Sequence, residues 1–176
     1  MAHWPEFNPR AQLRRLVRRE ADFVVVGAFA AVLHGSSRLT ADLDIAFAPD
    51  RANLEALATA LVDLKARLRG VEEDVPFVPD ADTLRRVSIL TLDTDEGPLD
   101  LIREPPGAPS YAILRRRAEP YDVDGMEVPT ASIEDLIEMK RAAGRTKDLA
   151  DVEELEAIRA LREGSHAPPP PPRRGR

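Results

Sequence analysis

The sequence contains no cysteine among its 176 residues, which excludes disulfide bonds, zinc sites built on thiolates and a cysteine nucleophile. It also lacks any apolar run of the roughly 20 residues that a membrane-spanning helix requires. The first residues, MAHWPE, lack the apolar core of a signal peptide. These absences predict a cytoplasmic protein with no membrane partner.

Excess positive charge is absent as well, since the formal net charge is −6. This balance argues against a protein that binds nucleic acid through bulk electrostatics. Arginine is nevertheless concentrated in two short segments, namely Arg10, Arg14, Arg15, Arg18 and Arg19, and then Arg115, Arg116 and Arg117. Each segment is either a basic surface for a polyanionic substrate or a solvated helix face.

The length and the apolar fraction of 43% fit one globular domain with an ordinary core. We expect residues 1–9 to form an N-terminal extension and residues 10–163 to form the domain. Residues 164–176 are rich in proline and arginine, so we expect a disordered tail that cannot bury a core.

Hydrophobic periodicity predicts an α+β fold with a short mixed sheet flanked by helices. Short β-branched or alternating segments predict strands over residues 23–26, 43–48, 87–92 and 99–102, and a hairpin over 121–129 that turns at Asp124-Gly125. Apolar residues at helical spacing predict helices over residues 10–19, 28–33, 54–68 and 147–161. Ser132 begins a further helix with a capping box, and Gly144 ends it.

Asp42 and Asp44 are the most informative pair in the chain. They stand where the second expected strand begins, and residues i and i+2 of a strand project from the same face. Two such carboxylates repel each other unless a cation compensates, and oxygen-only ligands suit Mg²⁺ or Mn²⁺. Asp100, between Leu99 and Leu101, would complete the cluster if its strand is adjacent.

The spacing alone is a weak signal, because Asp-x-Asp recurs at Asp80/Asp82, Asp93/Asp95 and Asp122/Asp124. Those three pairs lie beside proline or glycine, where turns explain them. The pair at Asp42 and Asp44 differs because it follows Gly27, which ends an apolar run, and enters a second apolar run.

Four segments in this order resemble bacterial nucleotidyltransferase-fold proteins, in particular the abortive-infection-type toxins and their small relatives. The segments are VGAFAAVLHG (26–35), RLTADLD (38–44), IEDLIEMK (133–140) and GRTKDLAD (144–151). The resemblance extends from about Phe23 to Leu155. It implies a polymerase-β-like fold in which C-terminal helices close a nucleotide site.

The resemblance implies a role for each matching residue. Gly27 and Ala28 would cradle the phosphates at a helix N-terminus, and Asp42, Asp44 and Asp100 would bind Mg²⁺ or Mn²⁺. Asp100 would otherwise act as the base. The remaining implied contacts to the nucleoside triphosphate (NTP) are Ser36, Arg38, Thr40, Lys140 and Lys147, with Lys140 also catalytic. Many relatives have glycine or serine where this chain has Ala28, so this position offers only its backbone amide.

Three functions follow from the resemblance. The first is transfer of a nucleoside monophosphate from an NTP to RNA, tRNA or a protein, in an enzyme that acts as the toxin of a toxin–antitoxin pair. The second is an antitoxin-like binding partner that keeps the fold with little catalysis. The third is transfer to a small molecule such as an antibiotic.

Overall fold

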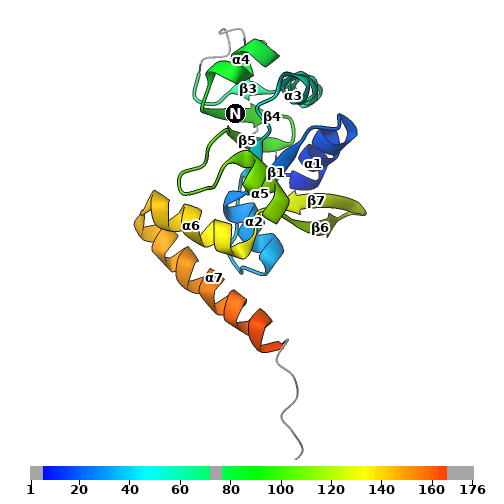
Figure 1. Ribbon diagram of the computed structural model, residues 1–176. Helices are drawn as coiled ribbons and strands as arrows, with labels where there is room; N and C mark the ends of the chain where they lie inside the picture. The colour runs from blue at the N-terminus through cyan, green and yellow to red at the C-terminus, as the bar shows by residue number, and fades with distance from the viewer. Residues whose placement is uncertain (1–5, 72–76, 166–176) are drawn as a thin grey trace, which may run out of the picture.

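The computed structural model describes residues 6–71 and 77–165. Seven strands form one mixed sheet in the order β3-β4-β5-β2-β1-β7-β6 (Figure 1). The strands are β1 (Phe23–Val26), β2 (Leu43–Phe47), β3 (Arg67–Leu68), β4 (Ile89–Thr94), β5 (Gly97–Ile102), β6 (Glu119–Val123) and β7 (Met126–Thr130).

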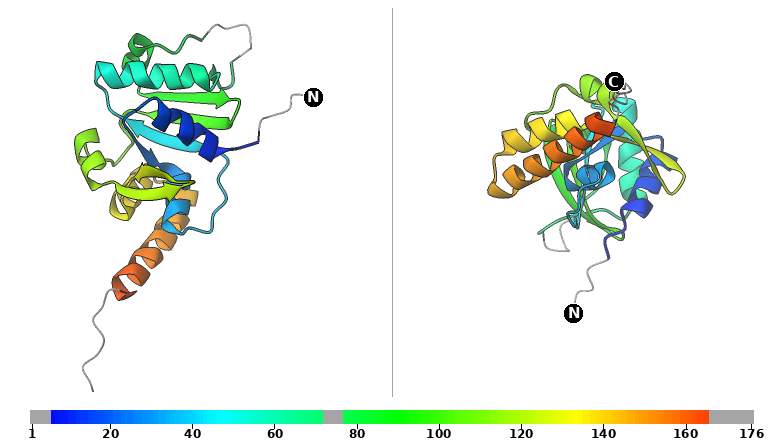
Figure 2. Two further views of the ribbon diagram at one scale, coloured as in Figure 1. Left: turned by 90° about the vertical axis from the view of Figure 1, so that its right-hand side faces the viewer. Right: turned by 90° about the horizontal axis from the view of Figure 1, so that it is seen from below.

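The helices surround this sheet. They are α1 (Pro9–Arg18), α2 (Gly27–His34), α3 (Arg51–Asp63), α4 (Ala81–Arg86), α5 (Tyr111–Arg117), α6 (Ile133–Ala143) and α7 (Thr146–Ser165). Helices α1 and α3 lie on one side of the sheet, and α6 and α7 lie on the other (Figure 2). None of the helices in the described ranges is both long enough and apolar enough to cross a membrane.

The alternation of side chains along β4 and β5 decides which face of the sheet is covered. Leu90, Leu92, Leu99 and Leu101 are buried on one face, whereas Ile89 is 58% exposed on the other. Burying one face of a strand pair while leaving the other open is typical of sheets with a solvated side. Part of the sheet therefore presents an uncovered surface.

The predicted α+β class is confirmed, and so are the short strand before Gly27, the hairpin of β6 and β7, and the Ser132 cap of α6. The Ser132 hydroxyl accepts a hydrogen bond from the amide of Asp135, as a capping residue does. Strand β1 is buried along its whole length, which is why it appears in the sequence as an uninterrupted apolar run.

The expected helix over residues 54–68 is wrong at its C-terminal end. Helix α3 ends at Asp63, and Lys65 takes a left-handed conformation with φ 51°. The amides of Lys65 and Ala66 then bond back to the carbonyls of Val62 and Leu61, which is a Schellman motif. The chain can therefore turn and form β3, where the sequence predicted more helix.

The sequence analysis did not predict helix α4 or strand β3. Helix α7 continues to Ser165, past the expected domain boundary at residue 163, and the other residues of the expected tail lie outside the described part of the chain. In the N-terminal extension, residues 1–5 also lie outside it, but Phe7 packs edge-on against Phe29.

Most arginines of the two basic segments have acidic partners. Arg10 and Arg14 lie near Asp124, Arg19 pairs with Asp63, Arg115 pairs with Asp22 and Arg117 pairs with Asp135. Such exposed pairs contribute little stability, but they lower the local positive charge. This pairing favours the interpretation of solvated helix faces.

Candidate active site

Strand register brings three carboxylates together. Strands β2 and β5 are parallel neighbours in which Asp44 is opposite Asp100, so the side chains of these two residues share a face. Asp42 precedes β2 by one residue and accepts a hydrogen bond of 3.0 Å from the Thr40 hydroxyl. One oxygen from each of Asp42, Asp44 and Asp100 lies within 4.8 Å of the others.

Gly27 fits closely against this cluster. It starts α2 directly after β1, and its φ is +69°, a conformation that glycine adopts without strain. A Cβ atom at this position would lie 2.0 Å from Oδ2 of Asp44. Only glycine therefore fits beside the carboxylate, and the first turn of α2 begins next to the acidic cluster.

The acidic cluster is electrostatically unfavourable by itself. Burial, together with the charges of Asp42 and Asp100, raises the pKa of Asp44 to about 7. Burial also raises the pKa of Asp100. Within the described residues, Oδ1 of Asp100 is buried without a hydrogen-bond partner. A carboxylate-only cluster of this kind fits a divalent cation such as Mg²⁺ or Mn²⁺.

The helical wall of the site carries cations that are held by buried carboxylates. Nζ of Lys140 lies 2.6 Å from Oδ2 of Asp151 and 3.6 Å from Oδ1 of Asp148. The Arg38 guanidinium pairs with the other oxygen of Asp151, and Arg145 donates to Asp148 at 2.7 Å. Asp148 is fully buried and Asp151 is 6% exposed, so α7 positions the basic groups of three other segments.

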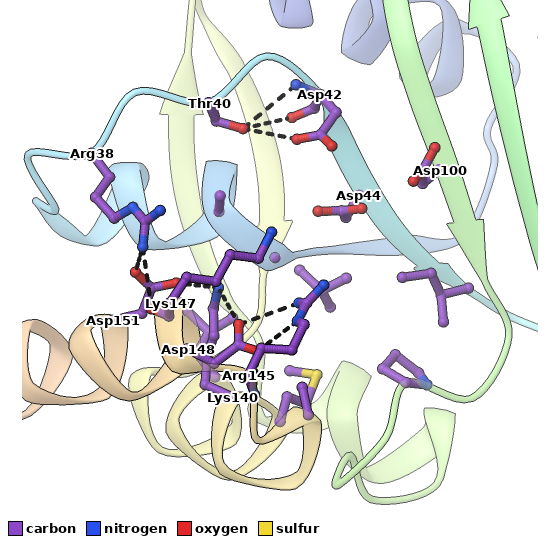
Figure 3. A pocket seen from close by; sticks show the side chains of 18 of the residues that line it. Arg38, Thr40, Asp42, Asp44, Asp100, Lys140, Arg145, Lys147, Asp148 and Asp151 are labelled. Atoms are coloured by element: carbon purple, nitrogen blue, oxygen red, sulfur yellow. Dashed lines mark hydrogen bonds and ion pairs between the residues drawn. The ribbon is translucent and has the colours of Figure 1, made fainter. Parts of the chain in front are cut away.

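Both walls line one cavity of about 410 Å³. The strand side contributes the three carboxylates, and the opposite side contributes Arg38, Lys140 and Arg145 with their partners Asp148 and Asp151 on α7 (Figure 3). Ala28, Thr40 and Lys147 also line the cavity, as do Pro105 and Pro106. The close approach of Gly107 to the Glu138 carbonyl, where a Cβ would be 2.6 Å away, packs the proline turn against α6.

The structure brings nearly all the predicted site residues into this cavity, and Ser36 is the exception. Ser36 is 8% exposed and is not part of the cavity lining. Its hydroxyl donates to Oε2 of Glu154 at 2.7 Å, and the amide of Ser37 donates to Oε1 at 2.8 Å. The hydroxyl of Ser36 is thus engaged by α7, which anchors the loop, and the expected contact of Ser36 with nucleotide stays a prediction.

Sequence reasoning did not identify Arg69 as a site residue. This side chain follows β3 and places Nη2 2.8 Å from Oδ1 of Asp100. No motif indicated it, because residues up to Leu68 were expected to be helical. Asp148 and Asp151 had a signal in the segment 144–151, but their spacing also fits an ordinary first turn of a helix.

Comparison of the sequence with models of known protein families gives no match, and comparison with curated protein sequences gives none either. Similarity is found among solved structures. The lincosamide antibiotic adenylyltransferase LnuA, with lincomycin bound, is 17% identical at a TM-score of 0.59, over 88% of this chain and 99% of that chain.

A second similar structure is the antibiotic-resistance factor ANT(2'')-Ia. Its solution structure is 13% identical at a TM-score of 0.51, over 90% of this chain and 92% of that one. Its complex with adenylyl-2''-tobramycin is 18% identical at a TM-score of 0.50. At these identities the likeness concerns the fold, and it confirms the predicted nucleotidyltransferase fold.

Proposed function

We propose that this protein is a metal-dependent nucleotidyltransferase that moves a nucleoside monophosphate from an NTP to an acceptor. The observation that supports this most is the convergence of Asp42, Asp44 and Asp100 within 4.8 Å at the start of α2. A fold can host many activities, so the proposal rests on this constellation and not on the likeness to antibiotic-modifying enzymes.

In this proposal the three carboxylates hold one or two divalent ions. Burial and the charges of Asp42 and Asp100 raise the pKa of Asp44, which indicates that the cluster as a whole is short of positive charge at this carboxylate. Bound there, Mg²⁺ or Mn²⁺ would stabilise the charge on the reacting phosphoryl oxygens. The residues of this chain would supply the remaining binding and orientation.

The first turn of α2 would bind phosphate oxygens. Backbone N–H groups at a helix N-terminus lack intrahelical partners and favour anions, and Gly27 and Ala28 line the cavity at that point. Because Ala28 has no hydroxyl, it would contribute its amide alone. Thr40 would orient Asp42 through the hydrogen bond between their side chains.

The helical wall would bind the rest of the triphosphate. Lys140, Arg38 and Lys147 all line the cavity, and the first two are held there by Asp151. Fixing basic groups before the ligand arrives reduces the ordering cost of binding and places them to stabilise charge in the transition state.

Transfer of radioactive label tests the proposal. NTPs labelled at the α-phosphate are incubated with the protein, Mg²⁺ and, in separate reactions, total RNA, purified tRNA, cell protein, and lincosamide and aminoglycoside antibiotics. We expect label to appear in one acceptor class and to disappear with Asp42→Asn plus Asp44→Asn. The matched control, Asp122→Asn plus Asp124→Asn, alters an Asp-x-Asp pair in the β6–β7 hairpin and should retain activity.

The separate reactions with different acceptors also distinguish between the three candidate functions. Label on RNA, tRNA or protein would support a toxin-like transferase, and growth arrest on expression would strengthen that conclusion. Label on an antibiotic would support a resistance enzyme. Absence of transfer from every NTP to every acceptor, together with a stoichiometric partner on purification, would favour the antitoxin-like binding module instead.

A further inference from the structure

The Asp100 side of the acidic cluster already contains a positive charge. Arg69 follows strand β3, and its Nη2 lies 2.8 Å from Oδ1 of Asp100. The N–H bonds are not aligned with that oxygen, since Asp100 Oδ1 has no hydrogen-bond partner in the described part of the chain. The contact is therefore best described as a close ion pair between Arg69 and Asp100.

The donors of Arg69 are directed elsewhere. Nε donates to Oδ1 of Asp93 at 3.1 Å, and Nη2 donates to the carbonyl of Leu92 at 2.8 Å. Both partners belong to β4, and the amide of Arg69 also bonds to the carbonyl of Thr91. The side chain is 30% exposed. These bonds fix the guanidinium against the sheet, so it cannot easily move away when another cation approaches.

The charge balance of the site then divides into two parts. Asp42 and Asp44 contribute two negative charges and have no ion pair among the residues that the structure describes, apart from the long-range influence of Lys140 and Arg69 on Asp44. The charge of Asp100 is offset in part by Arg69, which also pairs with Asp93. A divalent ion bound by Asp42 and Asp44 would balance that pair, whereas a second one near Asp100 would meet a fixed cation.

We propose that Arg69 is a built-in counter-ion of Asp100, which opposes divalent-ion binding at this third carboxylate until a triphosphate brings further negative charge into the cavity. This inference rests on the proposed metal site. Arg69 would have a positioning and regulatory role. Because of its charge, the ion nearest Asp100 would bind together with the nucleotide and not before it.

The direction of the effect follows from Coulomb's law. Two unit charges several ångströms apart near a protein surface interact by a few kcal/mol, and solvent reduces this for a side chain that is partly exposed. Removing the charge of Arg69 should therefore tighten divalent-ion binding by about tenfold. Loss of a residue with only a structural role would leave the affinity unchanged or weaken it.

Binding of Mn²⁺ to the full-length, nucleotide-free protein tests the proposal, with free Mn²⁺ measured by electron paramagnetic resonance. We expect Arg69→Gln to bind Mn²⁺ about tenfold more tightly than the wild type, and to bind additional ions. Arg69→Lys keeps the charge and should stay within about threefold of the wild type. Arg67→Gln is the matched control, because Arg67 lies two residues before Arg69, in β3, but pairs with Asp95.

A second measurement repeats the Mn²⁺ titration in the presence of nucleotide. Adding a non-hydrolysable NTP analogue should raise the number of bound Mn²⁺ ions in the wild type and have a smaller effect in Arg69→Gln. Circular dichroism and thermal melting establish that each variant is folded. If Arg69→Gln is folded but binds Mn²⁺ as the wild type does, or more weakly, the counter-ion role is refuted.

The variant Asp42→Asn plus Asp44→Asn distinguishes this failure from failure of the proposed function. If that variant loses Mn²⁺ while Arg69→Gln behaves as the wild type, the metal site stands and only the role of Arg69 is lost. If the wild type and Arg69→Gln both fail to bind Mn²⁺, the metal site and the counter-ion proposal are overturned together.

Discussion

Gly27 and Asp44 constrain each other at the scale of single residues. The positive φ of Gly27 lets α2 begin abruptly after β1, and the absence of a side chain leaves room for the Asp44 carboxylate. These are separate requirements, because an L-residue would be strained here even if space were available. One atom added at position 27 should therefore disturb the carboxylate cluster directly.

We expect Gly27→Ala to abolish most nucleotide transfer, with a loss of about 100-fold or more, because misplacement of a reacting group by an ångström has effects of that size. Gly125→Ala is the matched control. Gly125 also has a positive φ, of +77°, but a Cβ there would meet nothing within 4 Å. Both variants should lose about 1–2 kcal/mol of stability from backbone strain. Equal activities would contradict the prediction.

Asp44 makes the stability of the metal-free protein depend on pH. Its pKa is about 7 when folded, against 3.8 as the ordinary value. The folded state therefore binds more protons than the unfolded state between these values, and the free energy of unfolding should decrease as the pH rises from about 4 to about 7. The pKa of Asp100 is also raised and acts in the same direction.

We expect Asp44→Asn to be more stable than the wild type at pH 8 by roughly 2–4 kcal/mol in the absence of metal, since each pKa unit corresponds to about 1.4 kcal/mol. The advantage should diminish toward pH 4.5. Urea denaturation across this range with a chelator present measures it. Saturating Mg²⁺ should remove the advantage at pH 8, and a difference independent of pH would refute the assignment.

At this scale the sequence predicted arrangements that depend only on residues close together in the chain. Asp42 and Asp44 are two residues apart, so strand geometry alone places them on one face. Arg69 could not be found in this way, because its role depends on the pairing of β3 with β4 and of β4 with β5. The hydrogen bond of Ser36 to Glu154 could not be predicted either, because Glu154 is far away in sequence.

At the scale of elements, α7 organises the loop between α2 and β2. Glu154 accepts hydrogen bonds from the hydroxyls of Ser36 and Ser37 and from the amide of Ser37. Asp151, which also belongs to α7, pairs with Arg38 of the loop. These two carboxylates are almost one helical turn apart, so they lie on one face of α7. A single helix thus fixes the loop that leads to Thr40 and Asp42.

We expect Glu154→Ala to raise KM for the NTP by about 3–10-fold while kcat changes less, because the loop would lose its anchor and must be ordered on binding. The change in stability should be below about 1 kcal/mol, as for exposed ion pairs and hydrogen bonds. Steady-state kinetics measure the split. Glu153→Ala, an exposed neighbour in the same helix, is the control, and an unchanged KM in Glu154→Ala would contradict the prediction.

Element boundaries were predicted well where glycine or serine marks them. Gly144 ends α6 and Ser132 caps it, as the sequence indicated. The end of α3 was missed because Lys65 occupies the left-handed position that glycine usually takes. Apolar residues at Leu64 and Leu68 also continue the helical spacing, although they lie in a turn and a strand.

At the scale of the whole molecule, the candidate site lies between a sheet and a helical pair. The carboxylates come from the middle of the sheet, and the cations come from the loop after α2 and from the C-terminal helices. The sequence could predict the presence of both parts. It could not predict the strand order, because pairing β2 with β5 in parallel requires a long crossover that no local pattern specifies.

Because ligand contacts would connect the two parts, nucleotide binding should stabilise the whole fold. An NTP with Mg²⁺ at about 100 times its dissociation constant should add roughly 2.7 kcal/mol, which raises Tm by about 5–10 °C for a chain of this size. Differential scanning fluorimetry measures the shift. The NTP with a chelator, or the Asp42→Asn plus Asp44→Asn variant, should give little shift, and equal shifts in all three would exclude metal-dependent binding.

The position of α7 after all the other elements of the site has a consequence for protein synthesis. Ribosomes deliver the N-terminal part first, so the strands bearing Asp42, Asp44 and Asp100 emerge before Lys140, Asp148 and Asp151. Until α7 emerges, Lys140 has no carboxylate to position it, and the loop after α2 has no anchor. A nascent chain that lacks α7 would thus present an acidic cluster without its basic wall, and the proposed site would be complete only after α7 has emerged.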